Sequence, residues 1–210
     1  MNIEAFRARR NRLLAQMQRG VALIPTAPER VRNRDSHYPY RFDSYFYYLS
    51  AFREPEAVLV LIAGDEQKSI LFCRDKDTER EIWDGFRHGP DGAREVFRID
   101  EAHSIAKFDE MLPELIANQP TLFHSMGHDD GFDARVVAAL NRVRANARAG
   151  QHAPADIRDV RAMIDEMRLI KDEHELSTMR RAAAISTEAH RRAMQTTRPG
   201  RHEYEVEAEL

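Results

Sequence analysis

Apolar residues gather in short runs along the chain, and polar stretches rich in Gly, Pro, Asp and Asn separate these runs. The continuous apolar run 57–62 predicts a central strand that is buried on both faces. Shorter runs predict further strands at 21–24, 69–73 and 121–124. Apolar residues at helical spacing predict helices over 3–18, 101–117, 134–144 and 157–167. This alternation favours an α/β fold, with a mixed β-sheet flanked by helices.

Weaker patterns connect these elements. The aromatic run 45–49 predicts a strand, because aromatic residues are enriched in strands. A second short strand is predicted at 96–99, after a loop opened by Gly89 and Pro90. Residues 78–83 predict a short helix capped by Asp77. Residues 26–44 are predicted to form a long polar loop, a type of segment that is often functional when ordered.

The last forty residues follow a different, purely helical pattern. Asp172 and Glu175 have the spacing of a capping box, and a helix with a narrow face of small residues follows to about 196. Pro199 and Gly200 interrupt the pattern before a second helical run at 202–210. That run reaches the last residue without a cap, so we expect the sequence to be part of a longer protein. The predicted domains are 1–170 and a helical C-terminal extension at 171–210.

Charge and composition exclude several classes of protein. The chain has 32 Lys and Arg against 35 Asp and Glu, a net charge of -3, which does not call for a nucleic acid or an acidic membrane as partner. No apolar run is long enough to span a bilayer, and the N-terminus lacks the apolar core of a signal peptide. Cys73 is the single cysteine, so an intrachain disulfide is excluded. We therefore expect a cytoplasmic protein.

Spacing alone assigns no catalytic or metal-binding residue. The P-loop, G-x-S-x-G, H-E-x-x-H and G-x-G-x-x-G motifs are not in the sequence. His124 and His128 invite a metal site, but they lie around Gly127 at a strand end, which favours a polar surface loop. The glutamates of 203–209 spread around a helix and do not converge on one ion.

Two segments contain residues that are typical of binding sites and interfaces. The loop 34–41 combines charged, aromatic and proline residues, a composition that lines sites, although local capping and packing would also account for it. Trp83 stands beside Gly85, and a tryptophan in that setting is either a core residue or the anchor of an interface. The pattern leaves both alternatives open.

The same segments resemble a known family. The resemblance is carried, in the family's order, by Asp35–Arg41, Ser44–Tyr48, Phe52–Leu61, Glu81–Trp83 with Gly85, Glu166–Lys171, Glu175, Arg180–Ala182, Ile185, Ala189–His190, Ala193–Met194, Pro199–Gly200, Glu203, Glu207 and Glu209. Together they are similar to aminopeptidase P, the Xaa-Pro aminopeptidase of the pita-bread metallopeptidase superfamily. One departure is Ala51, where the family commonly has glycine, which is expected to alter a turn.

The resemblance implies an N-terminal domain followed by the start of a pita-bread catalytic domain. In that family two divalent metal ions, usually manganese, activate a hydroxide that hydrolyses peptides with proline in second position. The ligand motifs are absent from this sequence, so we expect no cofactor in this part of the protein and no activity from it alone. Its expected roles are homo-oligomerisation and gating of the active site.

Carried over residue by residue, the resemblance places Asp35 and Trp83 near the entrance of an active site, either this subunit's own or a neighbour's. Tyr38 from the same loop and Arg148 are further candidates. Two alternatives remain: a stand-alone, non-catalytic oligomerisation or recognition module, and part of a prolidase-like or creatinase-like enzyme.

Overall fold

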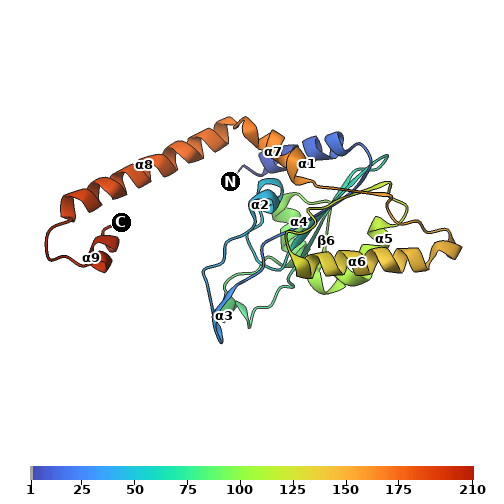
Figure 1. The fold of residues 1–210 in the computed structure, drawn as a ribbon, viewed down its shortest axis with the longest axis horizontal. Helices are drawn as coiled ribbons and strands as arrows, with labels where there is room; N and C mark the ends of the chain where they lie inside the picture. Colours follow the sequence, from blue (N-terminus) through green and yellow to red (C-terminus); the bar gives the residue numbers. More distant parts are fainter. Residues whose placement is uncertain (1) are drawn as a thin grey trace. The chain divides into compact units, whose positions relative to one another are not determined.

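The computed structural model describes residues 2–210, which form two compact units (Figure 1). The first unit extends to Asp165, and the second comprises Glu166–Leu210. The division falls within the helix α7 (Arg161–Leu169).

A six-stranded mixed sheet organises the first unit. Its strands, in spatial order, are β6 (Glu101–Ser104), β5 (Lys68–Cys73), β4 (Val58–Ala63), β1 (Gly20–Pro25), β7 (Thr121–Phe123) and β8 (Asp156–Arg158). β4 runs antiparallel to both β1 and β5, whereas the pairs β5–β6, β1–β7 and β7–β8 are parallel. The predicted mixed sheet is confirmed, and β4 is central, as its apolar run requires.

Helices cover both faces of this sheet (Figure 1). The helices of the first unit are α1 (Ile3–Met17), α2 (Ser44–Ser50), α3 (Glu81–Asp84), α4 (Gly89–Phe97), α5 (Phe108–Ile116) and α6 (Asp130–Ala145). α5 and α6 pack together and bury Phe108, Leu112 and Val136 against strand residues such as Val60 and Phe72. α1 contacts both α2 and α4, and these three helices contact the strands β1, β4, β5 and β6.

A buried arginine of α1 connects this helix to α2 and α4. Arg10 of α1 is 1% exposed, and its guanidinium donates to the backbone carbonyls of Leu49, Phe97 and Arg98 at 2.9, 3.1 and 2.6 Å. These carbonyls lie at the C-terminal ends of α2 and α4, where helices leave acceptors without intrahelical partners. One side chain therefore satisfies the ends of two helices.

The aromatic run at 45–49 is a helix, so the predicted strand is wrong. Asp43 caps α2 by accepting a hydrogen bond from the Phe46 backbone at 2.8 Å, and the cap outweighs the strand preference of the aromatic residues. The helix ends at Ala51, which has a left-handed backbone with φ 61°. Glycine adopts this conformation without the steric cost of a Cβ, so Ala51 carries a cost here that the glycine implied by the resemblance would avoid.

The elements between 89 and 117 also differ from the prediction. Gly89 and Pro90 begin α4 and do not form a loop, because proline is well suited to the first turn of a helix. The segment 96–99 is the end of α4 and the residues after it, and the strand β6 follows at 101–104. The helix predicted over 101–117 begins only at Phe108, after the 3-10 helix η1 (Ile105–Lys107).

Three further boundaries are corrected. The polar loop 26–44 contains a small antiparallel hairpin of β2 (Val31–Asn33) and β3 (Ser36–His37). The predicted helix over 78–83 starts later, at Glu81, while the Asp77 side chain accepts from the Arg80 backbone in the preceding turn. The residues from 156 form the edge strand β8 before α7 starts, because pairing with β7 outweighs their polar composition.

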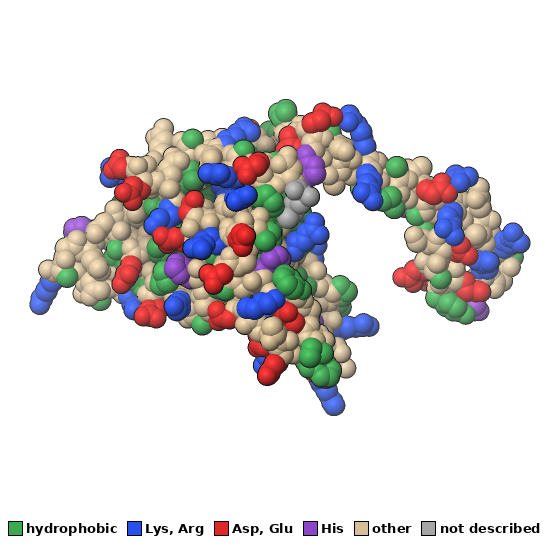
Figure 2. Space-filling model, turned by 180° about the vertical axis from the view of Figure 1, so that it is seen from behind, with side chains coloured by type: hydrophobic (Ala, Val, Ile, Leu, Met, Phe, Trp, Pro, Cys, Tyr) green, Lys and Arg blue, Asp and Glu red, His purple; other side chains and the backbone are tan. Residues whose placement is uncertain are grey.

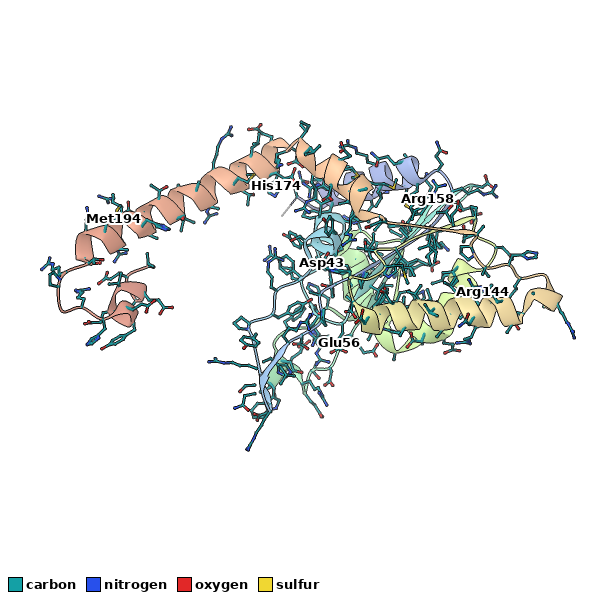
Figure 3. All side chains as sticks on the ribbon, in the orientation of Figure 1. Asp43, Glu56, Arg144, Arg158, His174 and Met194 are labelled. Atoms are coloured by element: carbon teal, nitrogen blue, oxygen red, sulfur yellow. The ribbon has the colours of Figure 1, made fainter. Side chains whose placement is uncertain are left out.

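The second unit consists of helices without a core of their own. α8 (Glu173–Thr196) begins with the predicted capping box: Asp172 accepts from the Glu175 backbone at 2.8 Å, and Glu175 accepts from the Asp172 backbone at 2.9 Å. α9 (Glu203–Glu207) follows. Neither helix buries a residue, and the side chains of α8, Met194 among them, stand off its ribbon on all sides in Figure 3.

Candidate functional site

The four candidate residues are all exposed on the first unit. Trp83 is 87% exposed and Tyr38 is 56% exposed, and the side chains of Asp35 and Arg148 also lie at the surface. Within residues 2–210 none of these four side chains has a hydrogen-bond, ion-pair or ring partner. Large aromatic groups without a partner are typical of surfaces that bind another molecule.

Asp35 and Tyr38 are presented by the β2–β3 hairpin. Asp35 lies in the turn between the strands, directly after Arg34, which has a left-handed backbone with φ 46°. Tyr38 follows β3, and its backbone N–H donates to the Arg30 carbonyl at 2.9 Å. The hairpin register therefore determines where both side chains emerge.

Trp83 lies on α3, a helix of one turn that ends at Gly85. Its neighbours Ile82 and Phe86 are 80% and 64% exposed, so three apolar side chains share one short surface segment. In Figure 1 the hairpin and α3 both extend from the lower end of the first unit, and Figure 2 shows hydrophobic side chains among charged ones at that end.

Arg148 does not join the other three candidates. It lies in the 3-10 helix η2 (Ala147–Ala149), beyond the C-terminal end of α6. Figure 1 shows that end of α6 at the opposite end of the first unit from α3 and the hairpin. A site that used Arg148 together with Trp83 would therefore need residues from more than one chain.

A groove of about 290 Å³ opens beside the hairpin, where β1 ends. Its lining residues come from the end of β1, the segments on either side of the hairpin and the caps of two helices, and they are Pro25, Thr26, Ala27, Pro28, Arg30, Tyr38, Pro39, Tyr40, Arg41, Asp43, His128 and Asp129. The carboxyl ends of the parallel strands β1 and β7 meet here, which is where ligands bind in open α/β sheets. Of the four candidates, this groove includes Tyr38 alone.

A hydrogen-bond network fixes the floor of the groove. The Tyr40 hydroxyl donates to the Ala27 carbonyl at 3.1 Å and accepts from the Thr26 hydroxyl at 2.8 Å. The Asp43 backbone N–H in turn donates to the Thr26 hydroxyl at 3.4 Å. Burial raises the pKa of Tyr40, so the phenol stays protonated at neutral pH and remains a donor.

His124 is buried, so the surface loop predicted there is wrong for this residue. Its Nε2 lies 2.8 Å from Asp133 of α6, and its Nδ1 lies 3.3 Å from the Leu23 carbonyl. Burial opposes ionisation of Asp133, but the Gly127 N–H and the His124 ring hold the pKa of this carboxyl below its usual value. The pair joins α6 to the end of β7, while His128 faces the groove.

Cys73 is a core residue of β5. The thiol is fully buried, and burial raises its pKa to about 12. A thiol in this environment stays protonated at neutral pH and is inert as a nucleophile.

Within residues 2–210 no three His, Cys, Asp or Glu side chains are grouped so that they could hold a metal ion. The donor set that two divalent ions require is therefore not provided by the described residues. The described helices also include none that is long and apolar enough to cross a membrane.

The mixed sheet with helices on both faces and the projecting hairpin define the N-terminal domain type of the aminopeptidase P fold. Residues 6–123 match the family described as "Aminopeptidase P, N-terminal domain". The chain belongs to this family, as its motifs indicate.

Curated relatives and solved structures agree with this assignment. Over 210 residues the chain is 42% identical to the Xaa-Pro aminopeptidase of Escherichia coli K12 and 39% identical to that of Haemophilus influenzae, covering 99% of this chain in each case. Zinc-substituted E. coli aminopeptidase P in complex with product superposes on the whole chain with a TM-score of 0.95 at 41% identity. Proline aminopeptidase P II from Yersinia pestis gives 0.95 at 40% identity.

The match covers only part of each relative. The chain spans 48% of the E. coli protein, 46% of the H. influenzae protein and 49% of the Yersinia structure, so it corresponds to about half the length of its relatives. Identity extends over nearly the whole chain, which includes both units described above.

Proposed function

We propose that this chain is the N-terminal part of a metal-dependent Xaa-Pro aminopeptidase, an enzyme that releases the first residue of peptides whose second residue is proline. The observation that carries the proposal is 42% identity to an Xaa-Pro aminopeptidase along the whole chain, together with the shared domain fold. The proposed division is an N-terminal domain at 1–170 and the first helices of a pita-bread domain at 171–210. We place the protein in the cytoplasm.

In this proposal the chemistry belongs to residues outside the sequence. Two divalent metal ions, expected to be manganese, would be held there and would supply the activated hydroxide. The described residues include no group of three or more His, Cys, Asp or Glu side chains that could hold a metal ion, and the 210-residue chain is expected to be inactive alone. Its contribution is structural: it shapes the approach to the site and joins subunits.

The exposed residues support a role at subunit contacts and at the entrance. Trp83, Ile82 and Phe86 present apolar surface that a partner subunit would cover. Trp83 would narrow the entrance, and Asp35 would engage a charged end of the peptide. Tyr38 and Arg148 would contribute from the same or another subunit of a homo-oligomer, since the fold separates Arg148 from the others.

The first experiment compares the 210-residue chain with a longer protein that continues into a catalytic domain. An Xaa-Pro peptide and its Xaa-Ala counterpart are incubated with each protein in excess manganese, and bound metal is quantified in the same samples. We expect proline-dependent release by the longer protein only, with bound metal only there. Turnover with stoichiometric metal in the 210-residue chain would contradict the proposal and direct attention to His124 and His128.

The second experiment tests the entrance residues in the longer protein. Trp83→Ala and Asp35→Ala are expected to raise the KM or change the preferred peptide length, whereas Val137→Ala is a matched control on an exposed face of α6. Light scattering over a concentration series measures assembly in the same variants. If Trp83→Ala and Asp35→Ala behave like Val137→Ala in both assays, the assignment of the entrance is wrong.

A further inference from the structure

The segment that presents Trp83 needs support from elsewhere in the fold. Residues 81–87, here called the Trp83 segment, contain a single helical turn and a glycine with φ 82°. A helix of one turn is not stable by itself in water. Its apolar side chains Ile82, Trp83 and Phe86 point to the surface and bury little area. Polar contacts must therefore hold the segment.

One set of contacts closes the segment on itself. The Lys76 ammonium donates to the Glu81 carboxylate and, at 2.8 Å, to the Arg87 carbonyl, and Glu81 also accepts from the Arg87 backbone at 3.0 Å. Lys76 and the Arg87 N–H hold the pKa of Glu81 below its usual value. The ammonium also lies 4.0 Å from the centre of the Phe86 ring. These contacts define the shape of the segment.

A second set of contacts fixes the segment to the sheet. Glu54, in the turn before β4, accepts two hydrogen bonds through Oε1 from His88, one from its backbone N–H at 2.8 Å and one from Nδ1 at 2.6 Å. The other carboxylate oxygen lies 3.8 Å from the Arg74 guanidinium, and the Glu54 side chain is only 11% exposed. A carboxylate this buried is costly without compensation: both hydrogen bonds from His88 reach Oε1, whereas Oε2 accepts no hydrogen bond from the described residues and only faces the Arg74 charge.

The His88 ring connects the Trp83 segment to the hydrophobic core. Its ring centre lies 5.8 Å from Phe52 and 4.9 Å from Phe97, both of which are buried in the core. On another side it meets Phe86 of the Trp83 segment edge to face at 4.9 Å. A displaced His88 ring would therefore lose its contact with Phe86, three residues from Trp83.

We propose that Glu54 is a positioning residue that, through His88, sets the orientation of the Trp83 segment. Its consequence for peptide binding rests on the proposed function, but its structural part does not. Glu54 lies in the turn that leads into the buried central strand β4, so its contact with His88 connects the Trp83 segment to the sheet. Loss of Glu54 would leave residues 81–87 closed by Lys76 yet free to reorient as a body.

The chain contains one tryptophan, so its fluorescence reports on this segment alone. We expect Glu54→Ala to lower the steady-state anisotropy of Trp83 and to speed tryptic cleavage after Arg80 or Arg87 several-fold, since a segment released from the sheet opens more often. Glu54→Gln keeps an acceptor for the His88 backbone but loses the charge that faces Arg74, so an intermediate result is expected.

Two further variants separate positioning from general stability. Asp100→Ala removes an exposed carboxylate that also holds sheet backbone, because it accepts from the Ser69 backbone and hydroxyl at 2.8 and 2.6 Å, and should lower the melting temperature without changing Trp83 anisotropy. His88→Phe keeps an aromatic ring but loses the Nδ1 bond, and should lower the anisotropy even if Glu54→Ala does not fold.

The inference fails if Glu54→Gln and His88→Phe leave anisotropy and cleavage at wild-type values, or if Asp100→Ala changes both equally. In the longer protein we expect Glu54→Gln to raise the KM for an Xaa-Pro peptide more than it lowers kcat. Absence of proline-dependent hydrolysis in the unmodified longer protein would instead overturn the proposed function and would leave the fluorescence result intact.

Discussion

The two units of the chain are stabilised by different means. The first unit buries large apolar side chains on both faces of its sheet, and many of them, such as Leu61 and Phe108, have no exposed surface. In the second unit α8 and α9 bury no residue and depend on caps and local ion pairs. The difference teaches that identity along the whole chain does not imply equal independence of its parts, because helices of this kind gain most of their stability from packing.

The largest effect is expected for Arg10, which belongs to the first unit alone. Arg10→Met leaves the carbonyls of Leu49, Phe97 and Arg98 without their donor in a buried site, so we expect a loss of about 3 kcal/mol or more in the free energy of unfolding. Burial lowers the pKa of Arg10 to about 10, so the group is charged at neutral pH. Urea unfolding followed by circular dichroism measures the change.

The control for this substitution is Arg12→Met on the exposed side of the same helix. Its effect should stay within about 0.5 kcal/mol, as for other surface changes. Equal effects of the two substitutions would mean that the carbonyls at the ends of α2 and α4 do not depend on Arg10.

A leucine-to-alanine substitution in each unit tests directly how much each unit depends on buried apolar side chains. Leu61→Ala in β4 is expected to cost about 3 kcal/mol, because it opens a cavity in a packed core. Leu176→Ala on α8 should change the free energy of unfolding by less than about 0.5 kcal/mol, since that side chain is only partly covered. Far-UV circular dichroism in urea measures both. A large cost at Leu176 would show that α8 is covered in solution.

A smaller effect is expected at the start of α8. Asp172→Ala removes the carboxylate that accepts a hydrogen bond from the Glu175 backbone N–H in the capping box. This loss should destabilise the helix by about 1 kcal/mol. Hydrogen exchange should then quicken at the first amides of α8. The amides of β1 and β4 in the same sample serve as the control, and faster exchange there would indicate that the two units unfold together.

The smallest expected effect is on the stability of the fold at acidic pH. The pKa of Asp133 is lower in the folded protein than its ordinary value of 3.8, so the unfolded state binds the proton more readily. The stability that Asp133 provides is therefore complete above about pH 4 and is lost as the pH falls through the folded-state pKa. Melting temperatures from pH 7 to 3 should fall less steeply for Asp133→Asn than for the unmodified chain. Parallel curves would exclude this contribution.

The sequence predicted those elements whose pattern has one physical solution. A six-residue apolar run such as β4 is too short for a typical helix and is rich in β-branched residues, which favours a buried strand, and Asp172 with Glu175 has the spacing of a capping box. The segment 45–49 is harder to assign, because aromatic residues pack equally well on a helix. The Asp43 cap at its N-terminal end makes the segment helical. The strand β8 has no apolar pattern and exists because β7 pairs with it.

The site was less accessible to such reasoning. Resemblance pointed to Asp35, Tyr38, Trp83 and Arg148, and these assignments remain predictions. The groove at the end of β1 was missed, because Thr26 and Tyr40 meet only after the hairpin folds back. The signal that could have found it is Pro25 at the end of a buried parallel strand, followed by a polar loop. The contact of Glu54 with His88 joins residues 34 positions apart and has no local signature.

The position of β8 at one edge of the sheet has a consequence for solubility. A strand at an edge offers unpaired backbone groups with which another chain can form a continuous sheet, the usual route to aggregation. β8 has only three residues, and Asp156 and Arg158 flank its single apolar residue, Ile157, with their side chains paired at 3.2 Å. Short length and charge make this edge a poor template.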